Sequence, residues 1–207
     1  MCIRDSLTAL QRDANRLLGF TAQQTLDYAQ SLYEKRLITY PRTDSRFLTE
    51  DMAASLPGLV TDTGRAFAVE EPIPIHVQQV INGSKVTDHH ALLVTENLPE
   101  GLSQDERAIY EMVAARLLEA FSPHCVKEMT EVALSAGGEI FTLKGAVVKS
   151  AGWRAVRGEP EEEVEEATLP ELQTDETLPL LASETVEKQT KPKPLHTEAT
   201  LLSAMET

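Results

Sequence analysis

The periodicity of the apolar residues changes once along this chain of 207 residues, near position 128. Before that point apolar residues recur every three or four positions, as on one face of a helix. After it, residues 131–135 and 140–145 alternate between apolar and polar on either side of Gly137 and Gly138, which predicts a β-hairpin. The sequence therefore predicts an α+β protein, with a helical domain at 7–128 and a β-rich segment at 129–195.

Capping residues mark where the helices of the first part begin. Thr21 and Gln24 form a capping box for a helix that follows a first helix over 7–18. Ser103 and Glu106 form a second capping box, and the helix behind them carries a continuous apolar stripe. The predicted buried faces of these two capped helices are Leu26, Ala29, Leu32 and Tyr33 in the first, and Ile109, Met112, Val113, Leu117, Ala120 and Phe121 in the second.

Other parts of the chain are predicted to be short elements or linkers. A short helix should follow Thr49 and end at Pro57 and Gly58. Lysine and proline alternate at 191–194, which predicts an extended linker before a helix that begins at residue 197. Further short strands are expected at 152–156, 178–181 and 184–187, and residues 1–6, which fit nothing that follows, are expected to be a non-native or disordered start.

Charge is distributed unevenly along the chain. The net charge is −14, and residues 159–187 carry eleven acidic groups and no Lys or Arg, whereas the first fifty residues carry seven basic and six acidic groups. This distribution excludes the basic stripe of a self-sufficient DNA-binding protein and predicts a solvated acidic loop at 159–187. There is no apolar run of about 18 residues, so we expect no membrane span. Cys2 and Cys125 form no disulfide or metal pattern, which favours a reducing, cytoplasmic location.

The strongest chemical signal lies in Tyr40, Pro41 and Arg42. Pro41 fixes its own backbone and favours an extended Tyr40, so that the phenol of Tyr40 and the guanidinium of Arg42 share one face. A phenol with a pKa near 10 is a weak nucleophile, but a guanidinium beside it can hold a phosphate and favour the phenolate. The pair suits attack on a phosphodiester, although a surface strand is the simpler interpretation of these residues alone.

Two longer strings resemble one family. Residues 32–45, LYEKRLITYPRTDS, resemble the active-site segment of the type IA DNA topoisomerases, and the proline after the tyrosine is similar to their topoisomerase III branch. The string Asp88-His89-His90-Ala91 resembles a segment in which a histidine lies near the scissile phosphate. From the residues alone, the two histidines indicate surface side chains rather than a metal site, because no third ligand stands at helical spacing. Val94 departs from the family, which usually has proline there.

The resemblance implies both a fold and a set of roles. The fold is the toroidal type IA fold, in which a helical tyrosine domain is followed by a β-rich arch. Tyr40 would attack one DNA strand to give a 5′-phosphotyrosyl link, the other strand would pass, and the bond would be resealed without ATP. Arg42 would hold the scissile phosphate, and His89 would make a second phosphate or proton-relay contact. Contacts to DNA, or a role in shaping the loop, are expected for Thr43, Asp44, Ser45 and His90.

The resemblance covers the middle of such an enzyme. Family members begin with a Toprim domain that binds Mg²⁺ through acidic residues, and no such motif is present here. We therefore expect a central fragment, inactive alone and without its own metal, that ends in the truncated start of a helical domain at 196–207. Its expected partners are single-stranded DNA and the missing Toprim and C-terminal segments of the same polypeptide. Two alternatives stay open: a non-catalytic single-strand DNA-binding module, and an acidic protein-interaction module based on residues 159–187.

Overall fold

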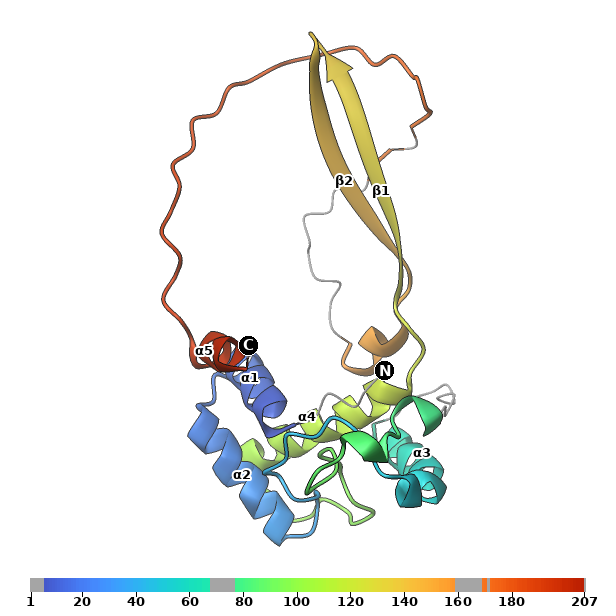
Figure 1. Ribbon diagram of the computed structural model, residues 1–207, viewed down its shortest axis with the longest axis vertical. Coiled ribbons are helices and arrows are strands. Elements are labelled where there is room, and N and C mark those ends of the chain that lie inside the picture. The colour runs from blue at the N-terminus through green and yellow to red at the C-terminus, as the bar shows by residue number, and fades with distance from the viewer. Residues whose placement is uncertain (1–5, 68–76, 159–168, 171, 207) are drawn as a thin grey trace. The chain divides into compact units, whose positions relative to one another are not determined.

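The computed structural model describes residues 6–67, 77–158, 169–170 and 172–206 of the chain. These residues form two compact units (Figure 1). The first unit contains the chain up to His124, a stretch that starts at Gly152, and the C-terminal segment from His196; the second contains residues 125–151 and a segment that ends at Leu195. Within the described residues, no helix has the length and apolar character needed to cross a membrane.

Helix α4 (Gln104–Phe121) is the element around which the first unit is built. It is contacted by α1 (Leu7–Leu18), α2 (Ala22–Glu34), α3 (Leu56–Ala66) and the 3-10 helix η4 (Gly152–Val156). Helix α5 (Glu198–Met205) lies against α1 (Figure 1). The connections between α2 and α4 contain the 3-10 helices η1 (Glu50–Ala54), η2 (Val77–Gln79) and η3 (Gly83–Lys85).

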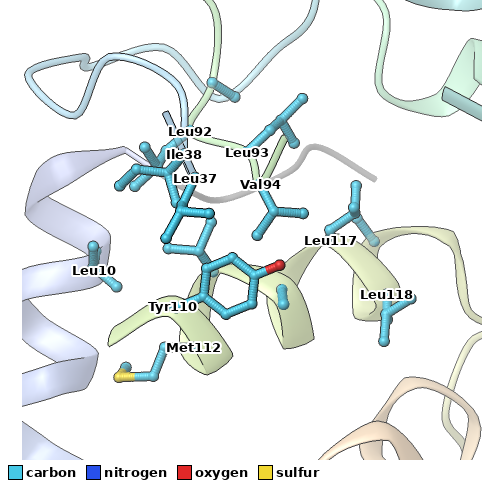
Figure 2. Packing of buried hydrophobic residues seen from close by; sticks show 14 of the residues in the cluster. Leu10, Leu37, Ile38, Leu92, Leu93, Val94, Tyr110, Met112, Leu117 and Leu118 are labelled. Atoms are coloured by element: carbon cyan, nitrogen blue, oxygen red, sulfur yellow. The ribbon is translucent and has the colours of Figure 1, made fainter. Parts of the chain in front are cut away.

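The apolar core of the first unit lies between α4 and the extended segments at 37–38 and 91–94 (Figure 2). Every residue of the predicted α4 face is buried, which confirms the stripe read from the sequence. Ile38 and Leu93 are each 1% exposed, so the two extended segments are as deeply buried as the helix below them. Because burial of one large aliphatic side chain stabilises a fold by about 1.5–3 kcal/mol, this cluster fixes the extended segments firmly.

The helix starts are capped as the sequence predicts. The Thr21 hydroxyl accepts the N–H of Gln24 at 3.1 Å, and the Gln24 side chain accepts the N–H of Thr21 at 2.9 Å. Ser103 and Glu106 form the same reciprocal pair at 3.2 and 2.9 Å. Helix α1 is capped by Ser6, whose hydroxyl accepts an N–H of the first turn at 3.3 Å and which is 2% exposed. Ser6 is therefore ordered as part of the first unit, which differs from the disordered start expected at this position, while residues 1–5 lie outside the described residues.

The prediction for residues 49–58 was wrong, because Pro57 and Gly58 belong to a helix instead of ending one. Helix α3 begins at Leu56 and has Pro57 in its first turn. At that position the missing N–H of proline costs no helical hydrogen bond, and the ring presets a helical φ. The short helix expected after Thr49 is the 3-10 helix η1, which ends at Ala54.

The predicted hairpin forms the regular part of the second unit. Strands β1 (Val126–Ala136) and β2 (Glu139–Ser150) pair antiparallel, with Leu134 opposite Phe141. Gly137 and Gly138 make the turn with φ angles of 62° and 89°. Positive φ at both turn residues is what a two-residue hairpin loop demands, and this is why the Gly-Gly pair predicted the turn correctly.

The strands predicted at 152–156, 178–181 and 184–187 are not found in the described residues. Residues 152–156 form η4, because Gly152 adopts a φ of 55° and turns the chain away from an extended path. Residues 178–187 are irregular and exposed. Pro179 lies inside the strand expected at 178–181 and lacks the N–H that a paired ladder needs, which explains why the apolar residues there do not form a strand.

Gly152 lies against the backbone of residues 123–124 in the first unit. The N–H of the next residue, Trp153, donates to the carbonyl of Pro123 at 2.9 Å. A Cβ added at Gly152 would lie 2.5 Å from this carbonyl oxygen and from the backbone of His124. Both the left-handed φ and this close approach therefore require glycine at position 152.

Glu106 joins the start of α4 to α2. Besides its capping bond, its carboxylate accepts hydrogen bonds from Lys35 Nζ and Ser31 Oγ, each at 2.6 Å. Glu106 is 8% exposed, so these bonds replace most of its contact with water. The Lys35 ammonium, the Ser31 hydroxyl and the Ser103 N–H together lower the pKa of the Glu106 carboxyl to about 2.

We expect Glu106→Gln to lower the free energy of unfolding by about 1–3 kcal/mol at pH 7, because charge-assisted hydrogen bonds are lost. The carboxyl pKa is lower in the folded chain than its usual value of 4.5. The carboxylate therefore stabilises the fold fully above that value, and the effect is lost as the pH falls towards about 2. Thermal unfolding followed by circular dichroism should show a gap between wild type and variant at pH 7 that narrows at pH 3. Glu111→Gln, an exposed change on the same helix, should behave like wild type at both pH values.

Candidate active site

A left-handed turn delivers the chain from α2 to Tyr40. Arg36 has a φ of 60°, and the N–H of Leu37 donates to the carbonyl of Leu32 at 2.9 Å. This arrangement satisfies a carbonyl at the end of α2 and reverses the chain direction. The exposed carbonyl of Arg36 accepts hydrogen bonds from Thr95 Oγ1 at 2.6 Å and from Asn97 Nδ2 at 2.8 Å, which hold the turn.

The segment that precedes Tyr40 is fixed by pairing with residues 93–95. Ile38 and Val94 form an isolated antiparallel bridge, and Thr95 N–H donates to the Leu37 carbonyl at 2.9 Å. Thr39 and Leu93 are bonded twice: Thr39 N–H donates to the Leu93 carbonyl at 2.8 Å, and Leu93 N–H donates to Thr39 Oγ1 at 2.9 Å. Figure 2 shows Leu37, Ile38 and residues 92–94 packed above α4. The backbone leading to Tyr40 is therefore held by hydrogen bonds and by the core.

The ring of Tyr40 lies between two other aromatic rings. Its centroid is 4.4 Å from that of His89, with the planes tilted by 45°, and 5.4 Å from that of Tyr33 in an edge-on contact at 78°. These distances are those of favourable aromatic pairs. The two predicted catalytic residues Tyr40 and His89 are thus brought together from segments 49 positions apart in the sequence.

Tyr33 also belongs to the candidate site, and its predicted place on the buried face of α2 is wrong. It was predicted on the buried face of α2, but it is 39% exposed and contacts Tyr40 instead. Its position depends on the left-handed turn at Arg36, which folds the chain back against the end of α2. A positive φ at a residue other than glycine is uncommon, so nothing in the sequence pattern indicated this contact.

Exposure alternates along the loop that follows Tyr40. The side chains at Pro41, Thr43 and Ser45 are buried, whereas those of Arg42 and Asp44 are exposed. This alternation agrees with the extended backbone inferred from the proline. Among the described residues, the Arg42 side chain has neither a hydrogen bond nor an ion pair, so its guanidinium is available to a ligand.

The hydroxyls of Thr43 and Ser45 are used inside the loop. Thr43 Oγ1 donates to the carbonyl of His89 at 3.1 Å and accepts the N–H of Ser45 at 3.1 Å. Ser45 Oγ donates to the carbonyl of Phe47 at 3.1 Å. The Thr43 carbonyl in turn accepts the N–H of Leu7 at 2.9 Å, which ties the loop to the start of α1. Both residues thus shape the loop that carries Arg42 and join it to the segment that carries His89.

The paired histidines have different surroundings. The His89 side chain is exposed apart from its contact with Tyr40, whereas His90 is half-buried and its Nδ1 lies 2.7 Å from the carbonyl oxygen of Ala91. In the part of the chain that the structure describes, no three His, Cys, Asp or Glu side chains gather closely enough to hold a metal ion. The residues present therefore offer no ligand set for a metal at this site.

The fold and this tyrosine site can be compared with known proteins. A sequence profile described as DNA topoisomerase matches residues 6–207, and the chain belongs to this family. The predicted resemblance to the type IA topoisomerases, and to their topoisomerase III branch, is confirmed by the relatives. The chain is 41% identical to DNA topoisomerase 3 of Bacillus subtilis and 37% identical to DNA topoisomerase 3 of Bacillus cereus, over 97% of its length in both cases.

A solved structure supports the same conclusion about the fold. The chain is similar to full-length topoisomerase I from Thermotoga maritima, with a TM-score of 0.64 and 25% sequence identity over 98% of this chain. The predicted α+β class, with helices followed by a hairpin of the toroidal type IA fold, is confirmed. The chain spans 29–30% of the length of these Bacillus relatives and 34% of the Thermotoga chain.

We expect Thr39→Val to loosen the backbone before Tyr40, because the buried N–H of Leu93 loses its acceptor. An unsatisfied buried donor costs about 1–3 kcal/mol, so the free energy of unfolding should fall by that amount. Hydrogen exchange at the Leu93 amide should accelerate in parallel. Thr61→Val removes an exposed hydroxyl that bonds within α3 at 2.8 Å and serves as the control. An unchanged exchange rate at Leu93 in Thr39→Val would show that the hydroxyl does not hold this segment.

Proposed function

We propose that this chain supplies the strand-cleaving tyrosine of a type IA DNA topoisomerase, an enzyme that changes DNA topology through a transient break in one strand. The observation that carries the proposal is the position of Tyr40. It follows a segment fixed by paired hydrogen bonds, and its ring centroid lies 4.4 Å from the ring centroid of His89. The exposed Arg42 follows two residues later. A nucleophile on a rigid backbone next to an available guanidinium suits phosphoryl transfer. Family membership supports the same chemistry.

The proposed reaction is a pair of transesterifications. Tyr40 Oη attacks the phosphorus of one phosphodiester and loses its proton, a bond forms between Oη and phosphorus, and the bond from phosphorus to the 3′ oxygen breaks. The 3′ oxygen leaves, takes up a proton, and the DNA stays attached to Tyr40 through its 5′ phosphate. After the other strand has passed, the 3′ hydroxyl attacks the phosphotyrosine and releases the tyrosine. The number of phosphoester bonds stays the same at each step, so no ATP is required.

Each site residue is given a role that its geometry permits. Arg42 holds the scissile phosphate, since an exposed guanidinium can bind phosphate oxygens with its planar fork. His89 contacts the phosphate or relays a proton next to the Tyr40 ring. Asp44 is exposed beside Arg42 and is proposed to contact DNA. Direct DNA contacts are also proposed for Thr43, Ser45 and His90, whose hydrogen bonds to the backbone leave part of their hydrogen-bonding capacity unused.

The proposed reaction also needs parts of the enzyme that lie outside this chain. Mg²⁺ would stabilise developing phosphate charge when bound by a Toprim domain, and the described residues of this chain offer no cluster of ligands for it. The proposed partners are single-stranded DNA and the Toprim and C-terminal segments of the same polypeptide. We propose a cytoplasmic location, since DNA is the substrate and Cys125, half-buried and unpaired, is compatible with a reducing compartment.

Two other functions are less well supported by the site. A non-catalytic single-strand DNA-binding module would explain the exposed Arg42, but such a module has no need of a tyrosine held in ring contact with a histidine. An acidic protein-interaction module would rest on residues 159–187, most of whose acidic groups lie outside the described residues. Covalent capture of DNA separates the first alternative from the enzyme, and deletion of 159–187 followed by a test of partner capture addresses the second.

The first prediction of this proposal is that Tyr40→Phe abolishes covalent capture of single-stranded DNA. The test uses a chimera in which this chain replaces the matching segment of the Bacillus subtilis relative, of which it covers 29%. Phenylalanine keeps the ring contacts with Tyr33 and His89 but removes the nucleophilic oxygen, so folding should be unchanged. Capture of labelled DNA is read by denaturing electrophoresis, with Tyr33→Phe as a matched control. Undiminished capture by the Tyr40→Phe chimera contradicts the assignment.

Arg42 should contribute to the rate rather than to the fold. If its guanidinium stabilises charge on the phosphate in the transition state, Arg42→Lys should slow cleavage by about 10²–10³-fold, as loss of one oxyanion contact does. Lysine keeps the charge but cannot form the bidentate fork. Single-turnover cleavage by the same chimera measures this, and an unchanged unfolding temperature shows that the effect is local. If Arg42→Lys cleaved DNA at the parent rate, the proposed role of Arg42 in holding the scissile phosphate would be wrong.

By itself, the 207-residue chain should form no covalent adduct with DNA and should bind DNA weakly. The phenol of Tyr40 needs further catalytic groups, and a net charge of −14 opposes binding to a polyanion. Incubation of the folded chain with labelled single-stranded DNA and magnesium, followed by denaturing electrophoresis, gives the answer. A covalent adduct formed without any added domain would show that the catalytic groups lie within this chain.

A further inference from the structure

Two arginines from separate elements share one carboxylate. Arg12 Nη1, from the middle of α1, lies 2.8 Å from Glu206 Oε2, and Arg46 Nη2, from the loop after Tyr40, lies 3.7 Å from the same oxygen. The side chains of Arg12, Arg46 and Glu206 are 37%, 44% and 32% exposed. The group is therefore open to solvent and accessible to a ligand.

One carboxylate does not neutralise two guanidinium groups, so this cluster keeps a net positive charge. Because exposed ion pairs are worth only about 0–1 kcal/mol, the carboxylate can be displaced at little cost. The arrangement is that of an anion site occupied by a weakly held anion from the same chain.

The cluster is attached to the same framework as Tyr40. Arg46 continues the exposed row of Arg42 and Asp44, because exposure alternates along this loop. The loop is tied to the start of α1 by the hydrogen bond from Leu7 N–H to the Thr43 carbonyl at 2.9 Å. Arg12 lies on that helix, so both arginines are positioned by elements that also fix the tyrosine loop.

We propose that Arg12 and Arg46 together bind a backbone phosphate of the single DNA strand that occupies the Tyr40 site, and that the Glu206 carboxylate takes the place of this phosphate in the absence of DNA. A guanidinium fork matches the two non-bridging oxygens of a phosphodiester as well as it matches a carboxylate, and the phosphodiester carries the same single negative charge as the carboxylate that it would replace. The inference rests on the proposed function, because DNA is the ligand, and it adds a contact distinct from those at the scissile phosphate.

The simpler explanation is that the three side chains only fasten α5 to α1. However, α5 is also held by other bonds: Glu198 Oε2 accepts the N–H of Ala22 at 2.6 Å, and Ala199 N–H donates to Asn15 Oδ1 at 3.2 Å. These bonds do not involve Glu206, so Glu206→Gln is expected to leave α5 in place. Substitution at Glu206 therefore distinguishes a displaceable anion from a structural link.

The test measures binding of a fluorescent single-stranded oligonucleotide to the 207-residue chain by anisotropy at several low salt concentrations. Arg12→Gln and Arg46→Gln should each weaken binding by about 3- to 10-fold, as loss of one typical solvent-exposed hydrogen bond does. The variant that lacks both arginines should reduce the slope of log affinity against log salt by about 0.7, the value for one phosphate contact on a single strand, because both arginines bind the same phosphate. Glu206→Gln should strengthen binding by a similar factor, and this gain should disappear in Glu206→Gln combined with Arg12→Gln and Arg46→Gln.

The controls use the exposed Arg65–Asp62 ion pair of α3, whose atoms lie 3.0 Å apart. Arg65→Gln and Asp62→Asn change the net charge by the same amounts as the test variants, so they report the non-specific effect of charge alone. The proposal is overturned if Arg12→Gln and Arg46→Gln weaken binding no more than Arg65→Gln, if Glu206→Gln binds no more tightly than Asp62→Asn, or if neither wild type nor Glu206→Gln binds. Failure of covalent capture by the chimera would instead contradict the proposed function while leaving this binding result intact.

Discussion

The site depends on the double hydrogen bond between Thr39 and Leu93. This contact joins two segments that are distant in the sequence and individually too short to form a sheet, and the core beneath them supplies the burial that keeps water from competing for the bonds. The segment at 91–94 thereby brings His89 to the ring of Tyr40. The geometry of the candidate site is thus a product of backbone pairing supported by apolar packing.

The scaffold could be predicted from the sequence to a useful extent, because its signals are local. Thr21, Ser103 and the Gly137–Gly138 pair each specify an element through bonds or backbone angles within a few residues. Pro57 was misread because proline is compatible both with the end of one helix and with the first turn of another, and the neighbouring sequence does not decide between them. The strand expected at 178–181 does not form although the residues there are apolar, because Pro179 has no N–H to donate to a ladder.

The arrangement of the candidate site follows from the sequence only in part, because only some of its residues are neighbours in the chain. Tyr40 and Arg42 are neighbours in the chain, so the extended backbone set by Pro41 was enough to relate them. His89 was linked to them through family resemblance, because periodicity does not reveal a contact between residues 49 positions apart. Tyr33 and the shared carboxylate of Glu206 depend on a left-handed turn and on the docking of α5, and neither leaves a pattern in the sequence.

The close approach of Gly152 to the backbone of residues 123–124 has a consequence for how this architecture can vary. Because Gly152 lies against the backbone of residues 123–124, the chain leaves the first unit before the hairpin and returns to it after the hairpin at nearly the same point. A longer or shorter hairpin therefore leaves the distance between residues 124 and 152 unchanged and does not disturb α4. The length of this hairpin can therefore vary without disturbing the tyrosine scaffold, provided that glycine stays at the position where the chain returns to the first unit.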